Sequence, residues 1–160
     1  MSYEIERKFL VANTIDVLNE TILEQQKIVQ GYLGINAEYV IRIRCMSVIK
    51  NGQVTDKAFI TVKSKNIGIV RQEYEYEIPH VDGLNMLILT NILHEPITKT
   101  RYVIKDQHNQ IWDVDFFEGK REGVVLAEIE LIDENTPTIL PSWIGKEVST
   151  SPEYFNSNMV

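Results

Sequence analysis

The sequence predicts a mainly β domain built from about eight antiparallel strands. Polar and apolar residues alternate with a period of two through most of the chain, turn-forming segments separate these stretches, and helical spacing is confined to three short regions. The alternating segments comprise residues 3–11, 27–33, 38–48, 57–65, 70–78, 97–105, 110–117 and 124–132.

The breaks between these segments carry turn chemistry. Asn51 and Gly52 form an Asn-Gly pair, which is a strong signal for a tight hairpin. Residues 105–110 (KDQHNQ) are polar, and residues 118–123 (EGKREG) include two glycines. Neighbouring strands are therefore expected to pair as antiparallel hairpins.

Three segments have helical spacing. Residues 14–25 follow Asn13, and residues 82–92 open at Asp82, so that a capping residue precedes an apolar helical pattern in both cases. A third, short helical piece is expected around Pro141–Gly145. Two amphipathic helices, loops and a partner subunit would cover the apolar surface of such a sheet.

The composition bounds the class of protein. A chain of 160 residues with 44% hydrophobic residues predicts a single domain over residues 1–160. One cysteine, Cys45, excludes a disulfide framework within the chain, and the absence of a leader or an apolar run predicts a cytoplasmic protein. A net charge of −7 argues against broad attraction to nucleic acid or anionic membranes, so that only a local basic cluster could hold an anion.

The charged residues share one face of nearly every predicted strand. Arg42 and Arg44 lie on one face of their strand, and Glu128 and Glu130 lie on one face of theirs. A sheet with its charged face in water would give this pattern routinely. A solvated face usually mixes Thr, Ser, Gln and Lys, however, whereas these faces concentrate like charges. The alternative is a barrel that encloses the charged faces.

Such an interior would be lined by basic and acidic side chains together. Enclosing an unpaired charge costs several kcal/mol, so the interior would need water, ion pairs and ligands. A polyanion suits the basic groups, and Mg²⁺ or Mn²⁺ suits the carboxylates, because these ions take oxygen ligands and bridge to phosphates. The pattern therefore points to a polyphosphate with its metal. The residues concerned are Lys8, Arg42, Arg44, Lys63, Lys99 and Arg101 against Glu4, Glu6, Glu73, Glu75, Asp115, Glu128 and Glu130.

The opening stretch EIERKF resembles the ExExK signature of the CYTH superfamily, the triphosphate tunnel metalloenzymes. This family includes bacterial inorganic triphosphatases, thiamine triphosphatases and class IV adenylyl cyclases. Further segments match in order along nearly the whole chain: QGYL at 30–33, IRIR at 41–44, TVKS at 61–64, RQEYE at 71–75, KTRY at 99–102, DVDFFEG at 113–119, LAEIEL at 126–131 and WIGKEVS at 143–149. The chain looks most like the short, single-domain bacterial inorganic triphosphatases.

The resemblance implies a fold and a set of site residues. The implied fold is an eight-stranded antiparallel closed β-barrel, with the charged residues inside and a few short flanking helices. Lys65 and Arg71 match less securely and are expected at a tunnel mouth. The implied roles are substrate binding by Lys8, Arg42, Arg44, Lys63, Arg71, Lys99 and Arg101, metal binding by Glu4, Glu6, Asp115, Glu128 and Glu130, and support of the basic groups by Glu73 and Glu75.

The implied activity is Mg²⁺- or Mn²⁺-dependent hydrolysis of a triphosphate, foremost inorganic tripolyphosphate, by a homodimer. Lys8 with Tyr32, or Lys99, is the base that the family suggests. A lysine acts as a base only if its pKa falls, whereas a carboxylate-bound water needs no such shift, so the base stays open.

Three other activities remain possible from the sequence. They are class IV adenylyl cyclisation, hydrolysis of thiamine or nucleoside triphosphates, and polyphosphate binding without turnover. Thiamine triphosphate would require an aromatic group at the entrance, for which Trp143 is the better candidate and Trp112 is expected in the core. No segment indicates a nucleobase pocket.

Overall fold

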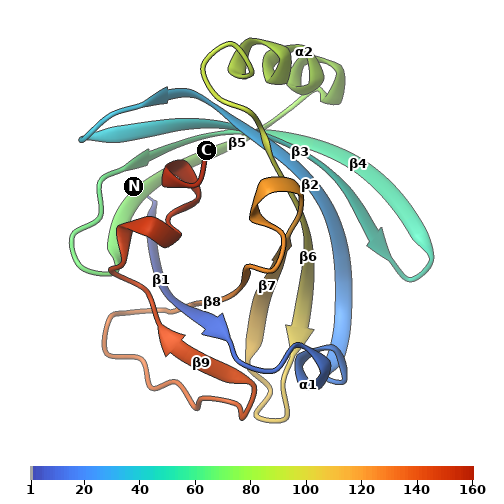
Figure 1. Cartoon of the computed structure of the whole chain (residues 1–160), viewed down its shortest axis with the longest axis vertical. Coiled ribbons are helices and arrows are strands. Elements are labelled where there is room, and N and C mark those ends of the chain that lie inside the picture. The colour runs from blue at the N-terminus through green and yellow to red at the C-terminus, as the bar shows by residue number, and fades with distance from the viewer. Residues whose placement is uncertain (1) are drawn as a thin grey trace.

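A computed structural model describes residues 2–160, and its strands form a closed antiparallel barrel (Figure 1). Around the ring the order is β5-β4-β3-β2-β6-β7-β8-β1, and β1 also pairs with β5, which closes the barrel. The expected fold class is confirmed. The strands are β1 (Tyr3–Val11), β2 (Thr21–Ile35), β3 (Tyr39–Lys50), β4 (Gln53–Ser64), β5 (Val70–Ile78), β6 (Ile97–Lys105), β7 (Ile111–Phe117), β8 (Val125–Glu130) and β9 (Ile144–Glu147).

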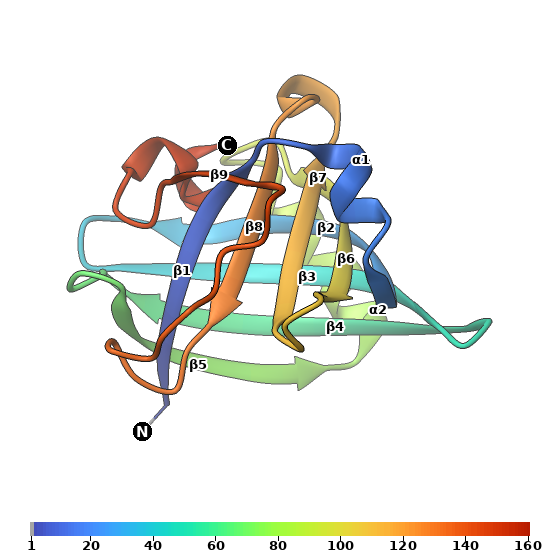
Figure 2. The ribbon, with the colours of Figure 1, turned by 90° about the horizontal axis from the view of Figure 1, so that it is seen from below.

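Strand β1 closes the ring by changing partners along its length. Tyr3–Ile5 pairs with Val70–Gln72 of β5, and Glu6–Leu10 pairs with Leu126–Glu130 of β8. Figure 2 shows β1 crossing the direction of β3, β4 and β5. The charged residues of the opening stretch therefore lie where the two ends of the sheet meet.

Strand β2 is longer than its sequence pattern predicts. The expected helix over residues 14–25 is correct only in its first part, because α1 (Thr14–Leu18) ends early and β2 begins at Thr21. Asn13 caps α1 as expected, with Oδ1 accepting from the backbone N–H groups of Ile15 and Asp16. Residues 21–25 extend instead because they pair with β6. This tertiary pairing overrides a local helical pattern.

The helical piece expected around Pro141–Gly145 is wrong. Residues Ile144–Glu147 form β9, which adds to the free edge of β1. Gly145 permits this approach, since a Cβ at that position would lie 2.9 Å from the carbonyl oxygen of Leu10. Short 3₁₀ turns complete the described chain: η1 (Gly119–Arg121), η2 (Pro152–Tyr154) and η3 (Asn156–Asn158).

Apolar side chains pack on the outside of the barrel wall. Phe9, Trp112 and Trp143 belong to one buried cluster, in which the two indole rings lie 5.4 Å apart between centroids. On another side, α2 (His80–Thr90) lies over β2, β3 and β4, as Figure 1 shows. Within residues 2–160, no helix has the length and apolar character needed to cross a membrane.

Helix α2 approaches the barrel closely because glycine stands at its contact points. A Cβ on Gly83 would collide with the Ala58 methyl group and lie 2.9 Å from Cys45 Sγ. On the barrel side, a Cβ on Gly31 would collide with Thr90 of α2. Small residues on both surfaces therefore set the distance between helix and wall.

We predict that Gly83→Ala destabilises the protein although alanine favours helix. The added methyl group overpacks the contact with Ala58, which costs about 1–3 kcal/mol and exceeds the gain of about 1 kcal/mol in helix propensity. A melting temperature lower by several degrees is expected. Asn85→Ala, on the exposed side of α2, is the matched control and should not lower the melting temperature. Equal melting of Gly83→Ala and wild type would contradict the close contact.

Candidate active site

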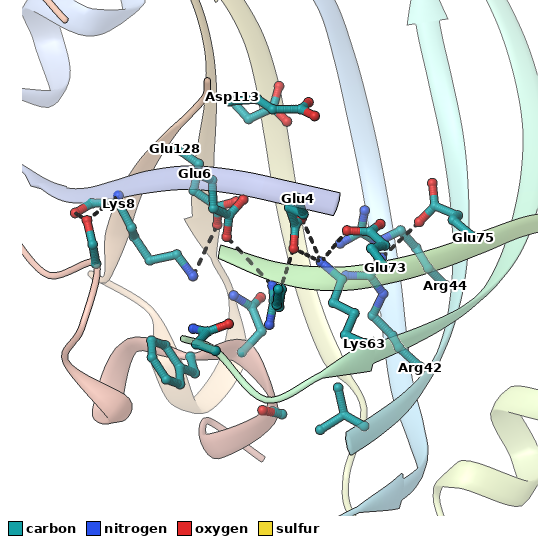
Figure 3. A pocket seen from close by; sticks show the side chains of 18 of the residues that line it. Glu4, Glu6, Lys8, Arg42, Arg44, Lys63, Glu73, Glu75, Asp113 and Glu128 are labelled. Carbon is teal, nitrogen blue, oxygen red and sulfur yellow. Dashed lines mark hydrogen bonds and ion pairs between the residues drawn. The ribbon is translucent and has the colours of Figure 1, made fainter. Parts of the chain in front are cut away.

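The inward faces of the strands line a charged cavity of about 390 Å³. Figure 3 shows side chains from β1, β3, β4, β5 and β8 pointing into it. Seven basic and seven acidic side chains take part, so their formal charges balance. The basic residues are Lys8, Arg42, Arg44, Lys63, Arg71, Lys99 and Arg101, and the acidic residues are Glu4, Glu6, Glu73, Glu75, Asp113, Glu128 and Glu130.

The predicted site residues meet in this cavity with one exception. Asp115 is completely buried beneath Lys99 and Arg101 and does not line the cavity. Lys65, expected at a mouth, lies on the surface, where it pairs with Glu38. Arg71 lines the cavity.

Glu4 holds two cations at the point where β1 meets β5. Its carboxylate accepts hydrogen bonds from Lys63 Nζ at 2.8 and 3.0 Å and from Arg71 Nε at 2.5 Å. Burial alone would raise the pKa of Glu4, but these cations lower it well below its ordinary value. Glu73 adds a second acceptor for Lys63 at 3.2 Å. This end of the cavity is a compact network of ion pairs.

Asp115 anchors the two basic residues of β6. Its Oδ1 accepts from Arg101 Nε at 2.6 Å, and its Oδ2 accepts from Lys99 Nζ at 2.6 Å and from Arg101 Nη2 at 2.9 Å. Both oxygens are thus used within the wall. Asp113, two residues earlier on the same face of β7, lines the cavity and accepts from Arg101 Nη1 at 2.7 Å.

The two lysines considered as a base differ in electrostatic environment. Burial lowers the pKa of Lys99 to about 7, since it outweighs the opposing effect of Asp115. For Lys8 burial acts in the same direction, but the carboxylates of Glu128 and Glu6 hold its pKa above the ordinary value. Lys8 Nζ lies 3.4 Å from Glu128 Oε1. Lys99 is therefore closer to a neutral amine than Lys8.

Glu6 lies beside other carboxylates. In the strand register it stands directly opposite Glu130, and Glu128 also lies nearby. Burial and the charges of Glu128 and Glu4 raise the pKa of Glu6 to about 8. Arg71 Nη2, at 3.7 Å from Glu6 Oε1, is too distant for a close ion pair. The pKa of Glu128 is lowered, because Lys8 and Arg101 outweigh its burial, so a proton shared by these carboxyl groups resides on Glu6.

The two arginines of β3 have more hydrogen-bond donors than the surrounding side chains have acceptors for them. Arg42 donates to Thr61 Oγ1 and Glu75 Oε2 at 3.1 Å each, but its buried Nε has no hydrogen-bond partner among residues 2–160. Arg44 donates from Nε and Nη2 to the amide oxygen of Gln30. A buried donor without an acceptor costs free energy that an anionic ligand would recover.

The chemistry of the acidic residues fits a hard divalent cation. Glu6, Glu128, Glu130 and Asp113 all offer carboxylate oxygens to the cavity. Within residues 2–160, no three acidic, histidine or cysteine side chains converge as a preformed metal cage. Mg²⁺ is typically bound by one or two carboxylates together with substrate phosphates and water, and needs no such cage. The donor set therefore suits an ion that arrives with a phosphate ligand.

Several cavity residues were missed by the sequence analysis. Asp113 shares strand parity with Asp115, and this signal could have found it. Phe155, Asn156 and Ser157 come from the irregular C-terminal segment, for which no periodicity exists. Asn156 Oδ1 accepts from Lys99 Nζ at 3.0 Å.

The expectation that Trp143 lies at an entrance is wrong. Its side chain is buried in the outer cluster with Trp112, and its Nε1 donates to Glu20 at 3.1 Å. Trp112 lies in the core as expected. The aromatic residues that line the cavity are Tyr32 and Phe155.

Known proteins resemble this chain over its whole length. The inorganic triphosphatase of Acetivibrio thermocellus is 41% identical over 162 residues, which cover 100% of this chain and 94% of that protein. The inorganic triphosphatase of Nitrosomonas europaea is 34% identical over 156 residues, with 96% and 93% coverage. The crystal structure of the inorganic triphosphatase NE1496 superposes with a TM-score of 0.64 at 29% identity, covering 99% of this chain and 95% of that one.

The family comparison agrees with the fold and with the sequence motifs. The model of the CYTH domain matches residues 2–158, nearly the full chain. The resemblance inferred from the motifs is confirmed, and the chain belongs to the CYTH domain family.

Proposed function

We propose that this protein hydrolyses inorganic tripolyphosphate with the help of Mg²⁺ or Mn²⁺. The observation that carries the proposal is the pair of buried β3 arginines that face the cavity. Among the residues that the structure describes, Arg42 Nε has no hydrogen-bond partner and Arg44 has no carboxylate partner. A polyphosphate would supply the missing acceptors. Inorganic triphosphatases at 41% and 34% identity support the choice of substrate.

The charge balance of the cavity supports a metal–triphosphate complex over a bare anion. Because the lining is formally neutral, a naked triphosphate would bring several uncompensated negative charges into a confined space. We propose Glu6, Glu128, Glu130 and Asp113 as the carboxylates that face the metal. When bound, the ion neutralises phosphate charge and lowers the pKa of coordinated water.

The remaining residues would act by positioning and by charge. Hydrolysis breaks one phosphoanhydride bond, forms a bond from a water oxygen to phosphorus and releases a proton. The arginines and lysines stabilise the charge on the phosphate oxygens. Between the proposed bases, the lowered pKa favours Lys99 over Lys8. Glu4 and Asp115 would hold the cations in place, since their oxygens already accept from them.

The competing activities have weaker support. Cyclisation of ATP requires contacts for adenine and ribose, and a thiamine group requires an aromatic platform. Phe155 is the candidate for the aromatic platform, although Lys8 Nζ already lies over its ring, 5.9 Å from the centroid. Binding without turnover is compatible with the basic groups but gives the carboxylate cluster around Glu6 no role. The cytoplasmic location stays a prediction from the sequence.

We also propose that the protein is a homodimer that pairs through α2. The helix buries Gly83, Leu87 and Thr90 on the barrel, yet exposes a second apolar stripe on its opposite side. A helix that is apolar on both sides is normally covered on both. The exposed stripe consists of Val81, Leu84 and Ile88 of α2 and Ile92 of the turn that follows it.

A second copy fits this stripe better than a charged partner does. Across residues 81–93 the only charged side chain is Asp82, near the start of the helix, so the surface offers little to salt bridges. Two copies related by a twofold axis would place the stripe against itself. Antiparallel pairing would also bring Asp82 of each copy toward the helix end where His94 of the other lies.

The substrate prediction is tested by a panel of three triphosphates. Phosphate release and cyclic AMP are measured from tripolyphosphate, ATP and thiamine triphosphate with Mg²⁺, Mn²⁺ or EDTA. We expect tripolyphosphate to be the best substrate and EDTA to abolish turnover, because the acids around Glu6 then have no counter-ion. Cyclic AMP formation from ATP that matches tripolyphosphate hydrolysis would refute the proposal.

The metal assignment predicts opposite effects on catalysis and stability. Glu6→Gln should lower turnover about a hundredfold or more. In the folded wild-type protein the pKa of Glu6 is about 8, above the ordinary value of 4.5, so protonation of Glu6 stabilises the folded state. This contribution is fully present below about pH 4.5 and is lost as pH rises through 8. Without metal, wild type should lose stability over this range, whereas Glu6→Gln should not.

Melting curves in EDTA from pH 5 to 8.5, with activity at pH 7.5, make both measurements. Glu77→Gln, an exposed residue of β5 outside the cavity, is the matched control and should change neither. Early melting of Glu6→Gln together with normal turnover would mean that Glu6 holds the barrel together and binds no metal.

The dimer surface is tested by sedimentation velocity. Ile88→Glu places a charge in the middle of the stripe and should convert a wild-type dimer to a monomer. Val54→Glu adds the same charge at another exposed apolar residue and should leave the dimer intact. A wild-type monomer, or an Ile88→Glu dimer, would refute pairing through α2.

A further inference from the structure

Arg44 is held in the cavity by an amide instead of a carboxylate. Its Nε and Nη2 donate to Gln30 Oε1 at 3.1 and 3.0 Å. Gln30 stands opposite Arg44 in the register of β2 and β3 and is completely buried. Within residues 2–160, no acidic side chain forms an ion pair with Arg44. The guanidinium is therefore oriented without being neutralised.

The other inward cations are held differently. Lys63 pairs with Glu4 and Glu73, and Arg101 pairs with Asp115 at 2.6 Å. A carboxylate both orients a guanidinium and cancels much of its charge. An amide oxygen accepts the same two hydrogen bonds but carries no net charge. Arg44 is the cavity arginine that keeps its full charge available for a ligand.

The orientation of the Gln30 amide is fixed by its other contacts. Nε2 donates to Tyr32 Oη and to Asn156 Oδ1, each at 3.2 Å. Asn156 Oδ1 also accepts from Lys99 Nζ, which requires it to be the oxygen and not the amide nitrogen. The Gln30 oxygen must then face Arg44. One buried amide thus connects Arg44, Tyr32 and, through Asn156, Lys99.

We propose that Gln30 is a positioning residue for the phosphate chain, which aims Arg44 into the cavity while leaving its positive charge uncompensated. The inference rests on the proposed function, because it takes a polyphosphate as the anion that Arg44 binds. Its consequence is that neutrality at position 30 matters as much as hydrogen bonding.

A carboxylate at position 30 would affect the free and the bound protein in opposite ways. It would form a two-bond ion pair with Arg44 and compete with phosphate for the same donors. In the free protein it would offset an existing cost, since burial together with Arg42 and Arg101 lowers the pKa of Arg44 to about 9. The Tyr32 hydroxyl can rotate to donate to the second carboxylate oxygen, and the Asn156 amide can turn so that its Nδ2 donates there too. Lys99 Nζ then keeps Asp115 as its acceptor.

The test compares Gln30→Glu with wild type by titration calorimetry and thermal melting. Tripolyphosphate is titrated with Ca²⁺, which supplies the counter-charge but, with its longer and looser coordination, is expected not to support turnover. We expect binding about tenfold to a hundredfold weaker, with a melting temperature in EDTA that is unchanged or higher. A purely structural role for Gln30 would lower binding and melting temperature together.

Two further variants separate charge from shape. Gln30→Met removes the amide without adding charge and should weaken binding less than Gln30→Glu, while lowering the melting temperature. Gln25→Glu adds the same charge on the opposite face of β2 and should leave binding unchanged.

Three results would overturn the inference. They are wild-type affinity in Gln30→Glu, equal losses of affinity in Gln30→Glu and Gln30→Met, and a marked fall in the melting temperature of Gln30→Glu.

Failure of the proposed function gives a different set of results. If wild type binds tripolyphosphate but hydrolyses it with neither Mg²⁺ nor Mn²⁺, catalysis is refuted and the comparison at position 30 stays valid. If wild type does not bind tripolyphosphate, the proposed function and the role of Gln30 are both overturned.

Discussion

The barrel depends on pairing enclosed charges across neighbouring strands. An isolated buried charge is costly, so each strand that brings a cation inward needs an acceptor on the strand beside it. Lys63 of β4 meets Glu73 of β5, and Lys99 and Arg101 of β6 meet Asp115 of β7. These pairs follow from the strand register, which sets Lys63 opposite Glu73 and Arg101 opposite Asp115.

Closure of the ring uses the same interactions as the site. Within the described residues, the register pairs β1 with β5 over Tyr3–Ile5, and Glu4 in the middle of them stands opposite Arg71. Its carboxylate binds both Arg71 and Lys63 and so joins β1 to β5 and β4. Glu4 therefore contributes to closing the barrel as well as to lining its cavity. A substitution there would disturb both, which makes Glu6, without a close cation, the cleaner probe of metal binding.

Strand parity explains why so much of the site could be predicted from the sequence. Alternation fixes which face a side chain occupies, so Lys8, Arg42 and Glu128 could be placed inside once the barrel was expected. Parity does not fix depth, and Asp115 and Asp113 share a face although only Asp113 reaches the cavity. Elements that depend on distant partners could not be predicted either. Pairing with β6 sets the start of β2, and pairing with β1 sets β9. The C-terminal turns contribute residues to the cavity, and no local sequence pattern predicts this.

The barrel wall is a single β-sheet, so a shift of its backbone moves the apolar side chains outside and the charged side chains inside together. Helix α2 contacts Cys45, Ala58 and Gly31 on the outer surface. Cys45 follows Arg44 in sequence, and Gly31 lies between Gln30 and Tyr32. Backbone shifts under α2 would therefore move the side chains that hold the anion. The close packing of α2 at Gly83 and Gly31 opposes such shifts, because neither contact leaves room for the barrel backbone to move toward the helix.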